Sequence, residues 1–190
     1  FSWCFITFLL EAEHKHSFRK QISYLPAIIS IFLTLVIGLL LNYELTYFSL
    51  LLVIFTFAYI KKDSIKIFGN FSFIVRGLME FTIFLYSVSI FTKISNFSQE
   101  VIVFSLAVFF IFSARSLMGD IRDTSFDKLT FSSTFGDRLA YIVSILFLLI
   151  GAFLLFTLSN DLEIIFPILL LIFVMLFYYN GYILHRSILI

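Results

Sequence analysis

The sequence predicts an all-α, polytopic integral membrane protein, and three observations support this fold class. Hydrophobic residues make up 61% of the 190 positions, while charged residues make up only 13%. A soluble domain of this size could not bury so much apolar surface, because too little of a small globule is interior. Apolar runs near the length of about 20 residues that spans a bilayer recur along the chain. These runs lack the alternating pattern of a membrane barrel, and isolated strands would leave backbone groups unsatisfied in lipid, so we expect helices.

The apolar runs predict about seven transmembrane helices. The first run, Phe1–Leu10, is too short to cross a bilayer, so we interpret residue 1 as an internal position of a longer protein. The other predicted spans are Ile22–Leu41, Leu45–Ile60, Phe71–Phe91, Val101–Met118, Leu139–Leu158 and Ile164–Leu184. We therefore expect residues 1–190 to form a single transmembrane helical domain that is incomplete at its N-terminus. Its C-terminal limit stays open.

Lysine and arginine occur almost entirely in alternate connections between the predicted spans. Eleven of the 13 lie on one side, Lys93 lies on the other side, and Arg76 lies within a span. The positive-inside rule places the basic side in the cytoplasm. We therefore expect an inner or plasma membrane protein whose charged loops and functional residues are on the cytoplasmic face.

Four aspartates occur in one highly charged stretch, "SARSLMGDIRDTSFDKLTFSSTFGDR", which begins in the last residues of the span ending at Met118, and three of them are close together. Asp120, Asp123 and Asp127 are spaced i, i+3, i+7, so they would share one face if the preceding helix continued a turn or two further. Carboxylates stacked in this way repel one another unless a cation lies among them, and oxygen ligands suit Mg²⁺. The spacing therefore predicts a magnesium site.

Two cations in the same stretch, Arg122 and Lys128, indicate what the metal would help to bind. Magnesium in proteins commonly takes one or two carboxylates together with substrate phosphates. Arginine and lysine can also hold phosphate oxygens directly. The combination favours the handling of a diphosphate at a membrane surface. The plainer interpretation is a solvated juxtamembrane loop whose cations only determine topology, and three aspartates alone do not decide between the two.

The stretch "RSLMGDIRDTSFDK", with "FGDRLAY" opening the next helix, resembles the second aspartate-rich motif of the UbiA superfamily of intramembrane prenyltransferases. That motif is Asp-x-x-Asp-x-x-x-Asp after a helix that ends in Arg, and a Gly then leads into the next helix. Asp120, Asp123 and Asp127 match the three acids. Arg115 and Gly136 match their surroundings.

The resemblance extends upstream and covers most of the chain. The stretch "AYIKKDSIKIFGNFSFIVRGL" resembles the lysine-bearing loop of the family, which opens a helix with an Arg-Gly pair, here Arg76 and Gly77. In the family, two aspartate motifs lie in cytoplasmic connections separated by four helices, and four predicted passes separate Glu11–Lys20 from Asp120 here. The resemblance implies that the chain supplies helices two to eight of a nine-helix bundle.

The resemblance also implies an activity and a set of site residues. The protein would be an Mg²⁺-dependent enzyme that moves a polyprenyl group from a prenyl diphosphate to an acceptor. Asp120, Asp123 and Asp127 would be its catalytic, metal-binding acids. The residues implied to bind the diphosphate are Arg122, Lys128, Lys62 and Arg76. Its partners would be the isoprenoid diphosphate, membrane lipids and an acceptor that the sequence does not identify. The sequence contains no nucleic-acid patch.

The sequence departs from the family pattern in two places. In the second aspartate loop, Phe126 stands where the family usually has a Gly before its third Asp, and "KLTFSSTF" lacks the Gly and the Thr-Leu-Pro stretch expected after it and is a few residues shorter. The first motif is expected as Asn-Asp-x-x-Asp, whereas the chain has "FLLEAEHKHSFRK", in which Glu11 and Glu13 are the available acids and would be the additional metal ligands. These departures favour an alternative function, a catalytically degenerate UbiA-like subunit or lipid-binding scaffold that acts with a protein partner.

Arg76 and Glu80 are four residues apart within the predicted span Phe71–Phe91. Ionisable residues inside a membrane are costly and by default indicate function, although a structural ion pair would explain these two equally well. They leave open a third function, an unrelated transporter in which this pair acts as a relay.

Overall fold

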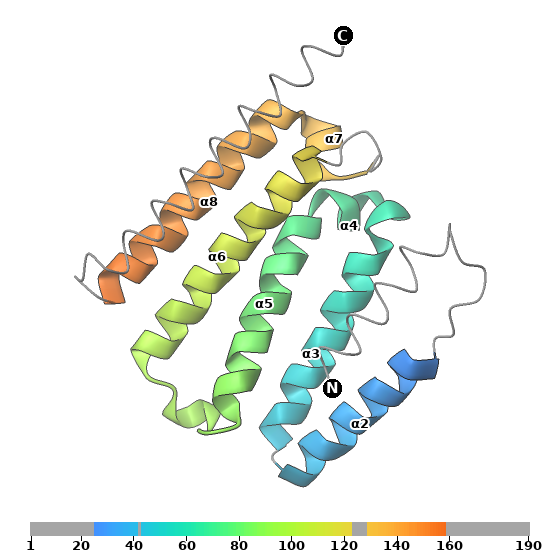
Figure 1. The fold of residues 1–190 in the computed structure, drawn as a ribbon, viewed down its shortest axis with the longest axis vertical. Helices are drawn as coiled ribbons and strands as arrows, with labels where there is room; N and C mark the ends of the chain where they lie inside the picture. The colour runs from blue at the N-terminus through green and yellow to red at the C-terminus, as the bar shows by residue number, and fades with distance from the viewer. Residues whose placement is uncertain (1–24, 42, 123–128, 159–190) are drawn as a thin grey trace.

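The computed structural model describes residues 25–41, 43–122 and 129–158, and the regular structure of these residues is entirely helical (Figure 1). The α-helices are α2 (Leu25–Leu41), α3 (Tyr43–Ile60), α4 (Lys66–Asn70), α5 (Ser72–Ser89), α6 (Gln99–Arg122), α7 (Phe131–Phe135) and α8 (Asp137–Leu158). Two short 3₁₀ helices, η1 (Lys61–Asp63) and η2 (Ile94–Asn96), lie in connections. The predicted all-α class is confirmed for the described part of the chain.

Four of these helices, α3, α5, α6 and α8, are long and apolar enough to cross a membrane, and α2 carries a shorter apolar segment. They coincide with five of the predicted spans to within a few residues, except at the end of α6, which continues past Met118 to Arg122. The predicted passes at Phe1–Leu10 and Ile164–Leu184 lie outside the described residues. The fold is therefore compatible with a membrane location.

The long helices pack side by side in chain order, so that each contacts the one before it and the one after it (Figure 1). Successive helices run in opposite directions because the connections between them are short. The C-terminal ends of α3 and α6 therefore lie at the same end of the row as the N-terminal ends of α5 and α8. The short helices α4 and α7 also lie at this end and contact each other. We call it the basic end, because it carries Lys61, Lys62, Lys66, Arg122 and Arg138.

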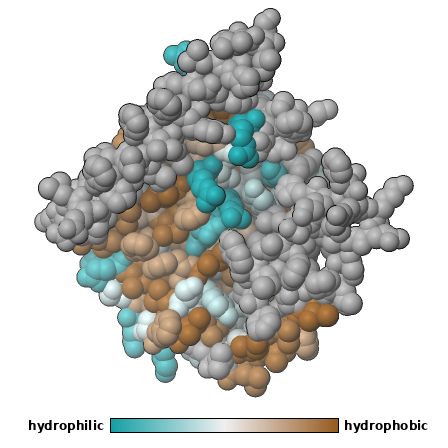
Figure 2. Space-filling model, in the orientation of Figure 1, coloured by the Kyte–Doolittle hydropathy of each residue, from teal (hydrophilic) through white to brown (hydrophobic). Residues whose placement is uncertain are grey.

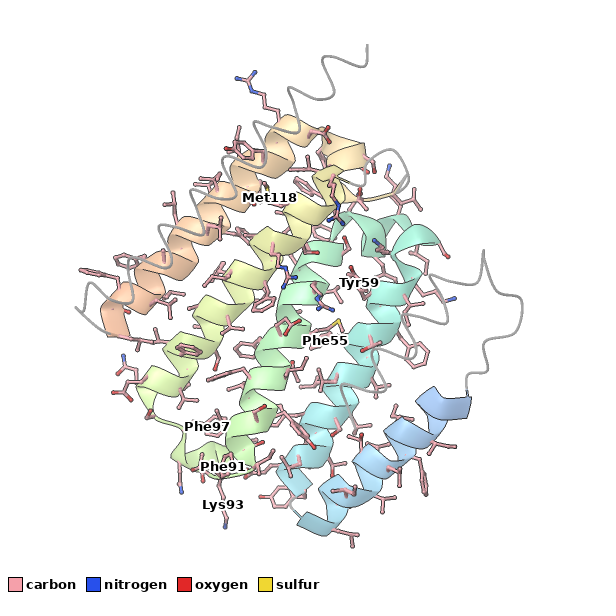
Figure 3. The ribbon with its side chains drawn as sticks, in the orientation of Figure 1. Phe55, Tyr59, Phe91, Lys93, Phe97 and Met118 are labelled. Atoms are coloured by element: carbon pink, nitrogen blue, oxygen red, sulfur yellow. The ribbon has the colours of Figure 1, made fainter. Side chains whose placement is uncertain are left out.

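The η2 connection lies at the opposite end, where Figure 3 shows Phe91, Lys93 and Phe97 near one another and the Lys93 side chain pointing away from the helices. Here the side chain of Glu44, at the start of α3, accepts a hydrogen bond from the Ile94 backbone N–H at 2.8 Å. This bond ties the α2–α3 hairpin to the α5–α6 connection. Lys93 is the one lysine or arginine that the described residues place at this end.

Small and polar residues take part in the contacts between helices together with apolar ones, and many other large apolar side chains are exposed. Buried positions in the helix contacts include Ser49, Thr56, Ser105 and Ser144. The Ser144 hydroxyl donates to the Ala114 carbonyl at 3.1 Å and so links α8 to α6. Apolar residues cover much of the visible face between the two ends (Figure 2). This distribution is expected in lipid, because apolar side chains gain nothing by leaving it and helices associate through close packing.

Two clusters of apolar side chains fill the space between the helices of the row. One centres on Leu52 of α3 and Met79 of α5, with Phe55 and Tyr59 packed against it. The other lies toward the basic end and joins α5, α6 and α8 around Phe73, Leu117, Met118, Ile121 and Ala140. In this second cluster the ring of Phe73 contacts those of Phe131 and Phe147, with centroids 5.4 and 5.8 Å apart. The second cluster therefore holds α6 at one position along its axis relative to α5 and α7.

Helices α5 and α6 are in close contact at Gly77. A β-carbon at this position would lie 2.7 Å from the Phe109 carbonyl oxygen and still closer to the Ser113 hydroxyl. Real β-carbons do not make contacts that short, so only Gly fits. Because Arg76 precedes Gly77, the same contact brings Arg76 against the last turns of α6.

We predict that Gly77→Ala destabilises the protein by about 1–3 kcal/mol, because α5 and α6 must separate to admit the methyl group. Gly119→Ala on α6 is the matched control, since a β-carbon there meets no atom within 4 Å. The control should leave the free energy of unfolding unchanged or raise it by up to about 1 kcal/mol, because Ala favours helix over Gly. Thermal unfolding in detergent measures both. A Gly77→Ala protein that melts at or above the wild-type temperature would contradict the proposed close contact.

Candidate functional site

A cavity of about 240 Å³ opens at the basic end of the row, between α3, η1, α5 and α6. Helix α6 contributes most of its wall, through Phe112, Arg115, Ser116, Gly119, Asp120 and Arg122. The other lining residues are Tyr59 at the end of α3, Lys62 in η1 and Arg76 in α5. Figure 3 shows Tyr59 between α3 and α5. Residues 112, 115, 116, 119 and 122 follow the three-and-four spacing of one helical face, so α6 turns a single face toward the cavity.

Asp120 is held in place by the elements around it. Its side chain is only 5% exposed, and the Ser72 hydroxyl at the start of α5 donates to its Oδ2 at 3.2 Å. The Ser132 hydroxyl of α7 donates to the Asp120 main-chain oxygen at 2.9 Å. A buried carboxyl group requires such partners, because loss of hydration is costly. Helices α5 and α7 thus fix Asp120 against the cavity.

Aromatic rings position two of the cations. Lys62 is only 6% exposed, and its Nζ lies over the Tyr59 ring at 5.5 Å from the centroid. The Arg115 guanidinium lies over the Phe112 ring at 5.8 Å, one turn earlier on α6. Cations are attracted to the faces of aromatic rings, and the attraction is stronger where water is excluded. These contacts restrict where the two positive charges can lie.

A carboxylate positions a third cation, Arg76. Its Nη2 lies 2.8 Å from Oε1 of Glu80, one turn further along α5. Two ionisable side chains this far inside a helix row are best tolerated as a pair. A guanidinium has five N–H groups in a planar fork, so a single bond to Glu80 uses only part of its donor capacity. Arg76 can therefore be held by Glu80 and still donate into the cavity.

Positive side chains outnumber negative ones among the described residues that line the cavity. Four cationic side chains, from Lys62, Arg76, Arg115 and Arg122, border the cavity, and Asp120 is the one acid among the described lining residues. A cleft lined by one sign of charge concentrates counter-ions of the other sign. Guanidinium and ammonium groups are the usual protein partners of phosphate oxygens. The described lining therefore has groups that could receive the oxygens of an anion.

The structure brings together four of the predicted site residues, Asp120, Arg122, Lys62 and Arg76. The helix before the aspartates continues beyond Met118 as far as Arg122 in the described residues, which extends it past Asp120. The other predicted site residues, Asp123, Asp127, Lys128, Glu11 and Glu13, lie outside the described residues. Among the residues that are described, no group of three His, Cys, Asp or Glu is placed to hold a metal ion.

Several residues of the site were not predicted as functional from the sequence. Arg115 was noted only as a match to a motif, and Tyr59, Phe112 and Ser72 received no role at the site. The spacing of Phe112, Arg115, Gly119 and Arg122 could have identified Arg115, because it puts both arginines on one helical face. No comparable signal pointed to Ser72, since it is 48 residues from Asp120 in the sequence.

Comparison of the chain with protein-family models, curated proteins and solved structures gives no match. The fold and the cavity nevertheless place the chain in a general class of protein. The described part of the chain is an all-α protein with four helices able to cross a membrane, and it carries a cation-lined cavity at one end of them.

We predict that Ser72→Ala lowers the free energy of unfolding by about 1–3 kcal/mol, because it removes the hydroxyl that donates to the buried Asp120 carboxyl group. Ser87→Ala is the matched control on the same helix. The Ser87 hydroxyl is exposed and donates only to the Ile83 carbonyl of its own helix, so the change should be within about 0.5 kcal/mol. Denaturation in detergent measures both variants. Equal effects would show that the Ser72–Asp120 bond does not hold the site.

Proposed function

We propose that this protein is an intramembrane prenyltransferase of the UbiA type, which moves a polyprenyl group from an isoprenoid diphosphate to an acceptor. The observation that carries the proposal is the cavity itself, in which four cations surround the buried Asp120 at one end of apolar helices. A prenyl diphosphate has the complementary chemistry, with a polyanionic headgroup and an apolar tail. The aspartate-rich motif that contains Asp120 supports the same assignment.

In the proposed reaction, catalysis consists mainly of stabilising the diphosphate as it leaves. The bond between C1 of the prenyl chain and the diphosphate oxygen breaks, and the diphosphate departs with the electron pair. The allylic cation that remains is captured by a nucleophilic atom of the acceptor, which then loses a proton. Cations aimed at the departing oxygens stabilise the charge that develops there. Lys62, Arg76, Arg115 and Arg122 would have this role, and Glu80 and the Phe112 ring would hold Arg76 and Arg115 in position.

Magnesium is part of this proposal through Asp120. A single buried carboxyl group at the edge of an anion site fits the way Mg²⁺ binds, with one or two carboxylates, substrate phosphate oxygens and waters. When bound, the metal would help to neutralise the leaving diphosphate. Asp123 and Asp127, and also Glu11 and Glu13, are proposed as further ligands on sequence grounds alone, as is Lys128 for the diphosphate.

We also propose that the basic end faces the cytoplasm, from the positive-inside rule. The test uses single cysteines at two exposed lysines, Lys61 at the basic end and Lys93 at the opposite end, in a Cys4→Ser background. A membrane-impermeant maleimide applied to intact cells should label Lys93→Cys and leave Lys61→Cys unlabelled until the cells are opened. If only Lys61→Cys were labelled in intact cells, the basic end would face the outside of the cell, opposite to the proposal.

A non-catalytic, lipid-binding subunit is the second candidate. The predominance of cations over acids in the described lining favours it, because such a cavity would also hold an anionic headgroup without reacting with it. The transporter hypothesis now rests on the Arg76–Glu80 pair alone, and it predicts pH-dependent flux in liposomes. An assay of prenyl transfer distinguishes these two functions from that of a prenyltransferase.

We predict that the purified protein transfers a radiolabelled prenyl group to an acceptor in the presence of Mg²⁺, and that Asp120→Asn lowers the rate by about 10²-fold or more. Arg138→Gln removes an exposed cation from α8, away from the cavity lining, and should leave the rate unchanged. Absence of both binding and transfer with common acceptors would eliminate the prenyltransferase proposal. Binding without transfer would favour the lipid-binding subunit.

A further inference from the structure

We infer that the connection between α3 and α5 is a binding surface for anionic phospholipids, which holds this end of the protein in the headgroup layer of the membrane. The surface consists of the apolar residues Ile65, Ile67 and Phe71 and the cations Lys61 and Lys66, all of them exposed, and we call it the η1–α4 surface. None of these residues lines the cavity. The inference depends on the membrane location that the long apolar helices support, and it is independent of prenyl transfer.

The apolar side chains of this surface are exposed in a part of the chain that does not cross the membrane. Ile65, Ile67 and Phe71 are 42%, 67% and 50% exposed. They lie between the end of α3 at Ile60 and the start of α5 at Ser72. Within a spanning helix such side chains would contact lipid, but in a connection they would face water unless something covers them. A group of exposed apolar residues at such a place indicates an interaction surface.

The packing of α4 explains why these side chains face outward. A β-carbon added to the buried Gly69 would lie 2.6 Å from the Lys62 carbonyl oxygen and still closer to that of Leu129. Both atoms belong to the backbone, so the inner face of α4 has no room for a larger side chain. Ile67 and Phe71 are four residues apart, and the Phe71 N–H donates to the Ile67 carbonyl at 3.1 Å. They therefore lie together on the outer face.

The geometry of the connection keeps this surface close to the ends of the spans. Backbone hydrogen bonds continue along it, with the Ile65 N–H donating to the Lys61 carbonyl at 3.0 Å and the Gly69 N–H to the Ile65 carbonyl at 2.9 Å. A helical chain rises only about 1.5 Å per residue, so the connection stays near the membrane. Figure 1 shows α4 beside the ends of α3 and α5, which it contacts. At this depth apolar side chains can reach the acyl chains, while lysines reach the headgroups.

The charge of the connection indicates which headgroups it binds. Residues 61–71 contain three lysines and one aspartate, so their formal charge is +2. Lys61 and Lys66 are exposed beside the apolar side chains. Lysines next to a membrane surface attract anionic lipids, and apolar side chains that enter the acyl boundary strengthen the binding. The combination is complementary to an anionic leaflet.

The second connection at the basic end has the same combination of side chains. Phe135, at the end of α7, is 54% exposed, and Arg138, at the start of α8, is also exposed. The two connections are joined, because α4 contacts α7 and the Thr134 hydroxyl donates to Asn70 Oδ1 at 2.7 Å. Apolar and cationic side chains on both connections favour a continuous lipid surface over a single protein partner.

The first test measures the depth of the η1–α4 surface in vesicles of phosphatidylcholine and phosphatidylglycerol. Spin labels are attached to the full chain at Ile67→Cys or at Ser64→Cys, each in a Cys4→Ser background. Ser64 is an exposed polar residue of the same connection and is the matched control. Oxygen, which concentrates among acyl chains, should relax the label at residue 67 more strongly than a water-soluble nickel chelate does. The label at residue 64 should show the reverse. A label at residue 67 that is accessible mainly to nickel would overturn the inference and indicate a surface for a water-soluble partner.

The second test measures lipid selectivity with spin-labelled phosphatidylglycerol and phosphatidylcholine around the reconstituted protein. Changing both Lys61→Gln and Lys66→Gln should lower the preference for phosphatidylglycerol about fivefold or more. The pair Lys61→Arg and Lys66→Arg keeps the charge and should keep the preference. All of these side chains are exposed, so the melting temperature in detergent should not change. Equal lipid preference in the wild type and the glutamine variant would overturn the inference.

Discussion

The close contact between α5 and α6 at Gly77 is the constraint on which the rest of the site depends. Because no side chain separates the two backbones there, Arg76 of α5 comes to border the same cavity as Arg115 of α6. The Ser72–Asp120 hydrogen bond, just over one turn earlier on α5, then fixes the axial register of the two helices. A shift of α6 by one turn would break both contacts and separate the cations.

The bilayer explains why the charges gather at one end of the row. Between the ends, small residues such as Gly77 and Ser144 let the helices pack closely, and many large apolar side chains are exposed, as expected for helices surrounded by lipid. Charged groups are costly in that central region, and Glu80, which lies one turn further from the basic end than Arg76, is paired with Arg76. At the basic end, backbone turns and water can satisfy them. A cavity there can hold several cations and still receive the headgroup of a lipid whose tail stays in the bilayer.

Much of the fold could be predicted from the sequence, because lipid imposes long apolar runs on any helix that crosses it. The positions of α3, α5, α6 and α8 follow directly from such runs. The short helices α4 and α7 could not be predicted, since five residues are too few to show a helical period. In the site, the motif identified Asp120. Contacts between helices bring Arg76, Arg115 and Lys62 to one cavity, and local sequence patterns do not encode these contacts.

The most direct measurement of the central claim is a crystal structure of the full chain grown in EDTA with tungstate, a heavy-atom analogue of phosphate. Its anomalous signal locates the anion independently of any assumed ligand pose. The account predicts a peak in the cavity within hydrogen-bonding distance of the Arg76 and Arg115 guanidinium groups. Tungstate bound elsewhere on the protein with none in the cavity, or Arg76 and Arg115 separated by a different register of α5 and α6, would contradict it.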